Sequence, residues 1–133
     1  MTHFEDLSPY EYWKKTWPQV APEHAEAMLN VGWLDPGVPY PKGRSAAEIL
    51  AALREKALEP VRLMRGVHHC GFCDSRSPLP FRSEISGRQG WLGNGELEVT
   101  AADGTIFVAP TLVVHYVGEH DYLPPQSFLD ALG

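Results

Sequence analysis

The sequence predicts a small α+β domain in which a zinc-stabilised CxxC turn, a β-hairpin and a helix form a module that packs against an N-terminal helical part. Two observations indicate this fold class. A helical pattern follows Ser45, whereas alternating apolar and polar residues flank the turn signal Asp103-Gly104. The only two cysteines, Cys70 and Cys73, precede that hairpin, and the pair His115 and His120 follows it.

The chain length fits one domain over residues 1–133, with a helical, aromatic part at 1–65 and a zinc-binding ββα-like module at 66–133. A chain of this size buries roughly two thirds of its unfolded surface, which is enough for a core. The aromatic residues Tyr12, Trp13 and Trp17 indicate a first segment that is held against this core.

A short helix is expected from Pro22 to about Leu29, because proline fits a first helical position and the glutamates after it complement the helix dipole. A short strand is expected over Asn30–Asp35. Three prolines then predict a loop over residues 36–44.

The clearest helix runs from Ser45 to about Leu58. Ser45 and Glu48 have the spacing of a capping box, and the apolar residues follow helical spacing up to Pro60. A strand over Val61–Met64 is expected to lead through Gly66 into the cysteine turn.

The second half is expected to begin with an irregular insert over residues 74–95, with a strand near Phe81–Ile85 and a turn at 93–95. The hairpin follows over Glu96–Val108. Its alternation predicts that Leu97 and Val99 face the core, whereas Glu96 and Glu98 face solvent.

Pro110 is expected to open a helix that carries both histidines, and its apolar face is formed by Leu112, Val113, Tyr116 and Val117. A last short helix is predicted over Gln126–Leu132, after two consecutive prolines.

The cysteine and histidine pairs predict a tetrahedral Zn²⁺ site formed by Cys70, Cys73, His115 and His120. Two thiolates and two neutral imidazoles balance the charge of the ion, and H-x4-H lies within the spacing of structural zinc sites. Residues five apart on a straight helix point about 140° away from each other, so both histidines reach one ion only if the helix end loosens, for which Gly118 is suited.

Other interpretations of these residues remain open. Cys70 and Cys73 could be a redox pair or plain thiols, although the polar residues after Cys73 are a poor helix start for a redox motif. The histidines could be ordinary helix residues. His68 is an alternative fourth ligand or a residue that orients a ligand, and His69 is a weaker candidate.

The formal net charge is −6 and is unevenly distributed. Residues 1–65 hold eight Lys/Arg and nine Asp/Glu, whereas residues 66–133 hold three and eight. Phosphate binding needs cations, so nucleic acid is not an expected partner, and the acidic surface favours a basic protein partner. The chain has no apolar stretch of membrane-spanning length and no apolar leader, which favours a cytoplasmic protein with no membrane partner.

Several segments resemble an uncharacterised bacterial protein family of unknown function. They are EDLSPY (5–10), NVGWLD (30–35), RGVHHCGFC (65–73), GNGELEV (93–99) and APTLVVHYVGEHDYLPPQSFLDAL (109–132). The resemblance implies a small metal-binding domain and transfers no reaction. A histidine two residues before the first cysteine is part of the family's pattern, which matches His68.

Three functions follow as hypotheses. The first is a non-enzymatic domain with a structural zinc site and a protein-interaction or regulatory role. The alternative is a zinc-dependent hydrolase or nuclease-like enzyme, in which water replaces His120 and Glu119 or Asp121 is the base. A nucleic-acid-binding finger is the third. A ligand pocket could also be lined by the aromatic residues and one carboxylate, namely Trp13, Trp17, Trp33, Trp91 and Asp35.

Overall fold

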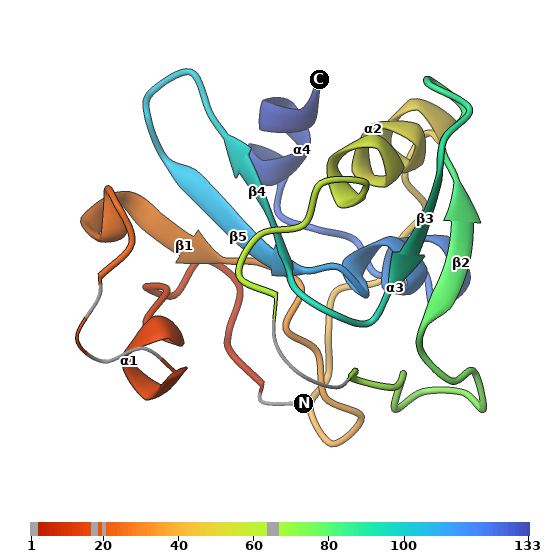
Figure 1. Cartoon of the computed structure of the whole chain (residues 1–133), viewed down its shortest axis with the longest axis horizontal. Helices are drawn as coiled ribbons and strands as arrows, with labels where there is room; N and C mark the ends of the chain where they lie inside the picture. Colours follow the sequence, from red (N-terminus) through yellow and green to blue (C-terminus); the bar gives the residue numbers. More distant parts are fainter. Residues whose placement is uncertain (1–2, 17–18, 20, 64–66) are drawn as a thin grey trace.

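The hairpin that the sequence predicts is the centre of the observed fold. In the computed structural model, which describes residues 3–16, 19, 21–63 and 67–133, β4 (Glu96–Thr100) and β5 (Ile106–Pro110) pair in antiparallel fashion around Asp103-Gly104. β1 (Met28–Asn30) pairs with the other side of β5 and runs parallel to it. The sheet order is therefore β1-β5-β4 (Figure 1).

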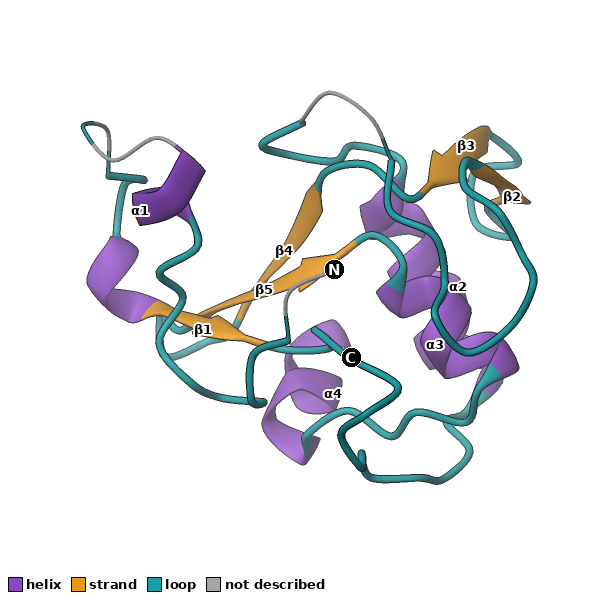
Figure 2. Cartoon of the chain, turned by 90° about the horizontal axis from the view of Figure 1, so that it is seen from below, coloured by secondary structure: helices purple, strands orange, loops and turns teal. Residues whose placement is uncertain are grey.

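Helices and a separate two-stranded ribbon complete the α+β fold that the sequence predicts. β2 (Leu79–Arg82) and β3 (Gln89–Leu92) form the ribbon. It lies beside α2 and α3, on the side away from β1 (Figures 1 and 2). The helical elements are α1 (Trp13–Thr16), the 3-10 helix η1 (Ala25–Ala27), α2 (Ala47–Ala57), α3 (Val113–Glu119) and α4 (Gln126–Leu132).

The main core lies between the sheet and helices α2, α3 and α4. Leu97 and Val99 are buried as predicted, and so is the expected apolar face of α3. Leu53 of α2 and Phe128 of α4 pack into the same cluster. Because β1 comes from the first half of the chain and β5 from the second, both halves contribute strands to one sheet. The boundary proposed at residue 65 stays a prediction.

A smaller cluster holds the N-terminal segment against β1 and β5. Trp33 is buried with Tyr10, Met28 and Val108, and its indole Nε1 donates a hydrogen bond to the carbonyl oxygen of Val108 at 3.0 Å. Trp33 is thus a core residue. Trp91 is 55% exposed in the ribbon, and Trp17 lies outside the described residues.

The expected helix from Pro22 to Leu29 is wrong. Only the 3-10 turn of η1 forms there, and β1 begins directly after it at Met28. The backbone of β1 pairs with β5, and this tertiary pairing overrides the weak local helix preference. Of the strand expected over Asn30–Asp35, only Asn30 lies in a strand, while residues 36–44 form the predicted loop with a single bridge at Lys42.

The predicted capping box before α2 is also wrong. Ala46 occupies the N-cap position and makes no side-chain cap hydrogen bond. The hydroxyl of Ser45 is buried without a hydrogen-bond partner among the described residues, and Glu48 is exposed. The helix itself agrees with the prediction within two residues, because its apolar spacing is independent of the cap.

Among the described residues of the strand expected over Val61–Met64, only Val61 forms a bridge, which joins it to Glu96. Arg62 has a left-handed φ of 50°, which ends the extended conformation. Met64 to Gly66 lie outside the described residues. Further on, the ribbon has two strands where one was expected, and the chain turns at Ser83 within the predicted strand Phe81–Ile85.

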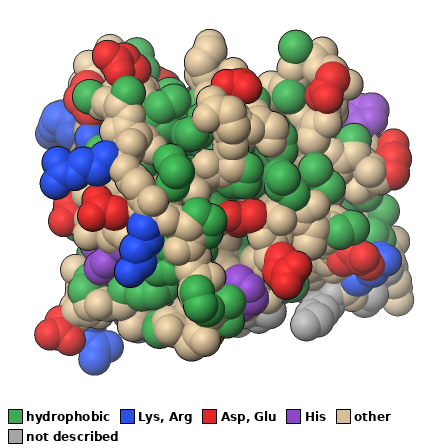
Figure 3. Space-filling model, turned by 180° about the vertical axis from the view of Figure 1, so that it is seen from behind, with side chains coloured by type: hydrophobic (Ala, Val, Ile, Leu, Met, Phe, Trp, Pro, Cys, Tyr) green, Lys and Arg blue, Asp and Glu red, His purple; other side chains and the backbone are tan. Residues whose placement is uncertain are grey.

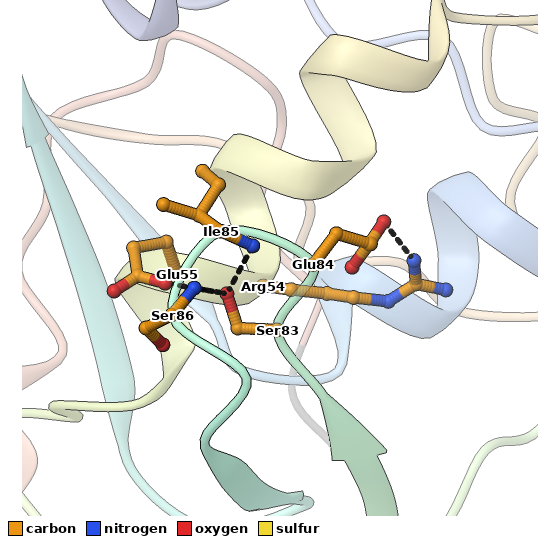
Figure 4. A network of polar contacts seen from close by, with 6 residues as sticks. All are labelled: Arg54, Glu55, Ser83, Glu84, Ile85 and Ser86. Atoms are coloured by element: carbon orange, nitrogen blue, oxygen red, sulfur yellow. Dashed lines mark hydrogen bonds and ion pairs between the residues drawn. The ribbon is translucent and has the colours of Figure 1, made fainter.

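The buried hydroxyl of Ser83 fastens this turn to α2. It donates a hydrogen bond to Glu55, and it accepts hydrogen bonds from the backbone N–H groups of Ile85 and Ser86 (Figure 4). Next to it, Arg54 of α2 contacts Glu84 at 2.8 Å. These contacts fix the tip of the ribbon to a helix of the main core.

Glu96 does not face solvent, contrary to the prediction. It is 2% exposed, and it accepts hydrogen bonds from the Tyr10 hydroxyl at 2.7 Å and from the Arg62 guanidinium. Arg62 also contacts the carboxylate of Glu98 at 2.6 Å and lies over the Tyr10 ring. Burial raises the pKa of Glu96, and the hydrogen bonds from Tyr10 and Arg62 act in the opposite direction.

We expect the substitution Arg62→Ala to lower the free energy of unfolding by about 3–5 kcal/mol, because it leaves the buried carboxylate of Glu96 without its cation. The substitution Glu98→Gln removes a more exposed partner of the same arginine and is expected to cost less than about 1 kcal/mol. Urea denaturation of both variants measures this difference. If both variants lost the same free energy of unfolding, the buried ion pair of Arg62 with Glu96 would contribute no more than the contact with Glu98, contrary to this prediction.

Candidate metal centre

Four side chains from two distant segments converge at the end of α3. The cysteines lie in the metal loop, which we define as residues 67–78, and the histidines belong to α3 and its C-terminal end. The ligand atoms of Cys70, Cys73, His115 and His120 all lie within 4.8 Å of one another. These four residues lie close enough together to hold a metal ion.

The distances between these atoms match a tetrahedral ion. The Nε2 atoms of His115 and His120 are 3.3 Å apart. Each Nε2 also lies 3.4 Å from a sulfur, His120 from Cys70 and His115 from Cys73. Ligand atoms around tetrahedral zinc are about 3.3 Å apart for two nitrogens and about 3.5 Å for nitrogen and sulfur, given zinc bond lengths of about 2.05 and 2.3 Å. The spacing and the chemistry of the four donor atoms are thus compatible with zinc.

The end of α3 brings the two histidines together. His115 lies in the helix, whereas His120 follows its last residue and has φ −121° and ψ 14°, outside helical values. Asp121 then takes a left-handed φ of 52°, which turns the chain away. The helix end is therefore no longer helical at His120, as is needed for both histidines to reach one ion. Gly118 remains inside the helix.

Aromatic contacts hold the metal loop in place beside the histidines. Phe72, between the two cysteines, packs against Tyr40, Tyr116 and the ring of His120. The Tyr40 hydroxyl donates a hydrogen bond to the backbone carbonyl of His120 at 2.9 Å. Both Phe72 and Tyr40 were missed by the sequence analysis, because neither belongs to a periodic pattern or a ligand motif.

A glycine allows the metal loop to approach the main core closely. Gly93 has a φ of 113°, and a Cβ atom at this position would lie only 2.3 Å from the side chain of Ser77. Its carbonyl oxygen accepts a hydrogen bond from the backbone N–H of His68 at 2.7 Å. Any larger residue at position 93 would push the loop away from β3 and β4.

The surroundings of the candidate ligands shift their pKa values in different directions. Burial lowers the pKa of His115, and the neighbouring His120 lowers it further. Hydrogen bonds with Ser75 lower the pKa of the exposed Cys73, whereas burial raises that of Cys70. Cys70 also accepts a hydrogen bond from the backbone N–H of Phe72 at 3.4 Å, which supports a thiolate there.

The other histidines of the metal loop lie outside the four-residue cluster. His68 is half-buried, and burial lowers its pKa. The ring of His69 accepts a hydrogen bond from the backbone N–H of Ser77 at 2.9 Å. No helix opens at the cysteines, since residues 71–74 are bends, and this differs from the strand-to-helix setting of a redox motif.

A cleft of about 450 Å³ opens beside the cluster. Cys73, His115 and His120 form part of its wall, and the remainder includes Phe81 and Leu92 of the ribbon, Arg54 of α2 and Glu119 of α3. Cys70 does not line the cleft and is only 5% exposed. The centre is therefore open to solvent from one side.

The chain belongs to the family described as Domain of unknown function (DUF7919), which matches residues 2–133. This agrees with the resemblance seen in the sequence segments. No curated protein and no solved structure matches the chain. Across the described residues, every helix is too short or too polar to cross a membrane.

We expect the substitution His120→Ala to weaken zinc binding by more than about 100-fold, because the loss of a partner that only supports a ligand already costs about 10–100-fold. The control His69→Ala removes a histidine from the same loop and is expected to change the affinity by less than about threefold. Competition with a chromogenic chelator measures both values. If His69→Ala were the weaker binder, the assignment of the four ligands would be wrong.

Proposed function

We propose that this protein is a non-enzymatic zinc-binding domain in which a structural Cys2His2 centre fixes the metal loop to α3, and that the surface around the centre binds a protein partner. The tetrahedral spacing of the four donor atoms carries this proposal. Structural sites fill all four positions with protein ligands, whereas catalytic sites keep one open.

Energetics support a structural role. Zinc binding by a structural site contributes on the order of 10–16 kcal/mol, whereas a whole domain is stable by only about 5–15 kcal/mol. The metal loop contains no helix or strand over residues 67–78. The backbone N–H of His68 donates a hydrogen bond to the carbonyl oxygen of Gly93, which connects the loop to the rest of the chain. A bound ion would thus supply much of the free energy that orders this segment.

The hydrolase hypothesis has less support. It requires water in place of His120. However, the distances from His120 Nε2 to Cys70 Sγ and to His115 Nε2 are those expected between two donors of the same ion. Two thiolates also make zinc a weaker Lewis acid than the histidine-rich sets of hydrolases. The cleft with Glu119 on its wall is the observation in favour of this alternative.

Charge around the centre favours a partner with a basic segment. Asp74 follows Cys73, and Glu119 and Asp121 flank His120, and all three carboxylates are exposed. Figure 3, seen from behind, shows carboxylates spread over this face and Lys and Arg mainly at its left, which is the side of α2 and the ribbon. The three exposed carboxylates attract cationic groups and repel phosphate backbones.

Chelation tests the structural role. We expect one zinc ion per chain in protein purified without chelator, and a fall of at least about 10 °C in Tm when a chelator removes it, because the ion supplies much of the free energy that orders the metal loop. Cobalt substitution should give the absorption spectrum of a tetrahedral site with two sulfurs. A five-coordinate spectrum, or zinc retained with an unchanged melt in His120→Ala, would favour the open catalytic site.

Charge reversal tests the partner. We expect a lysine-rich probe peptide to bind the zinc-loaded protein in low salt, and the variant Asp74→Lys/Glu119→Lys/Asp121→Lys to lose at least tenfold in affinity, because steering by exposed charges is strong at low ionic strength. The control Glu23→Lys/Glu26→Lys/Asp103→Lys makes the same charge change at other exposed positions. Equal losses in the two variants would exclude a surface at the metal centre.

A further inference from the structure

We propose that Cys73 is an oxidation site, at which a peroxide oxidises the thiolate and leads to a Cys70–Cys73 disulfide and release of zinc. This inference rests on the proposed zinc centre and adds a modification to it. It starts from the unequal exposure of the two sulfurs and from the open cleft on one side of the cluster.

The two cysteines differ in access. Cys73 is exposed and lines the cleft, whereas Cys70 is buried and does not line it. The cleft volume of about 450 Å³ is far larger than a peroxide molecule needs. A small oxidant in the cleft therefore meets the sulfur of Cys73 first, with the imidazoles of His115 and His120 beside it.

The second sulfur lies within reach for a disulfide. The Sγ atoms of Cys70 and Cys73 are no more than 4.8 Å apart, and bound zinc would hold them about 3.8 Å apart. The residues from Gly71 to Asp74 are bends, so the S–S bond can form without the loss of a helix or strand. Disulfide formation then requires the two sulfur atoms to approach from this distance to about 2.05 Å.

The reaction balances with a peroxide as the named oxidant. The Cys73 thiolate attacks one oxygen of hydrogen peroxide, the O–O bond breaks, and Cys73 becomes a sulfenic acid while hydroxide leaves. The Cys70 thiolate then attacks the Cys73 sulfur and expels a second hydroxide. The two thiolates lose two electrons, the peroxide gains them, and two protons from solvent complete two water molecules.

Oxidation removes two of the four donors, and the two imidazoles left have no thiolate charge to hold the ion. The metal loop would then still have its aromatic contacts through Phe72 and its hydrogen bond to Gly93. The sheet and α4 contain no ligand, so their core would persist. The expected product is a folded chain with a loosened metal loop and an exposed α3 end.

The test treats zinc-loaded full-length protein with a small excess of hydrogen peroxide in the presence of a chromogenic zinc indicator. We expect one zinc released per chain, a mass loss of two hydrogens and the loss of both free thiols. Dithiothreitol with added zinc should restore the starting state. Zinc that stays bound under these conditions, or that leaves while both thiols remain free, would overturn the proposal.

Two matched variants locate the point of attack. Cys73→His and Cys70→His each keep four donors, but only Cys70→His keeps the exposed thiolate. We expect peroxide to release zinc at least ten times faster from Cys70→His than from Cys73→His, and equal rates would overturn the proposal. If either variant fails to fold, timed alkylation of the wild-type protein decides, since Cys73 must be labelled before Cys70.

The zinc content of the untreated protein distinguishes a failure of the zinc centre from a failure of the oxidation site. Absence of zinc from untreated, reduced protein would overturn the metal centre itself. Zinc that is present at one per chain but resists peroxide would overturn only the role of Cys73 and would leave the structural centre intact.

Discussion

The junction between the metal loop and the end of α3 is the constraint on which this half of the molecule depends. The loop has no regular secondary structure of its own, and it precedes a ribbon that is separate from the main sheet. Four convergent donors, the Phe72 contacts and one close approach at Gly93 set its position. The ribbon in turn forms the far wall of the cleft, so the same junction shapes the space beside the cluster.

A second polar junction involves Glu96, the first residue of β4, which pairs with the last residue of β5. Tyr10, Arg62 and Glu96 come from three separate segments and meet in a nearly dry environment. Each group alone would be costly to bury, but together they satisfy one another. An ion pair with a tyrosine thus joins these three segments, whereas the Cys2His2 cluster lies between the metal loop and the end of α3.

The sequence predicted the elements whose signals are local. The hairpin around Asp103-Gly104, the apolar spacing of α2 and the final helix α4 all depend on neighbours within a few residues, and the structure confirms them. β1 was read as part of a helix because its partner β5 is far away in sequence. Burial of Glu96 was missed for the same reason, since its partners lie in segments with no visible link to the hairpin.

The candidate site was predictable to a similar extent. The spacing of two cysteines and two histidines is enough to indicate a metal ion, because only a few geometries satisfy those donors. The supporting residues could not be found, since Tyr40 lies in a proline-rich loop and reaches His120 only through its backbone carbonyl. Of the two alternatives for the fourth position, His120 lies in the four-residue cluster, and its place depends on how α3 ends, which is a property of the folded chain.

The parallel pairing of β1 with β5 also determines how the chain can fold as it leaves the ribosome. Residues 28–30 have no strand partner until residues 106–108 have been made, and the cluster needs His120 as well. Nearly the whole chain must therefore emerge before the sheet can close. Until then the cysteines remain as unprotected thiols, so the cellular supply of metal and of reducing agents during synthesis would influence how many chains reach the native state.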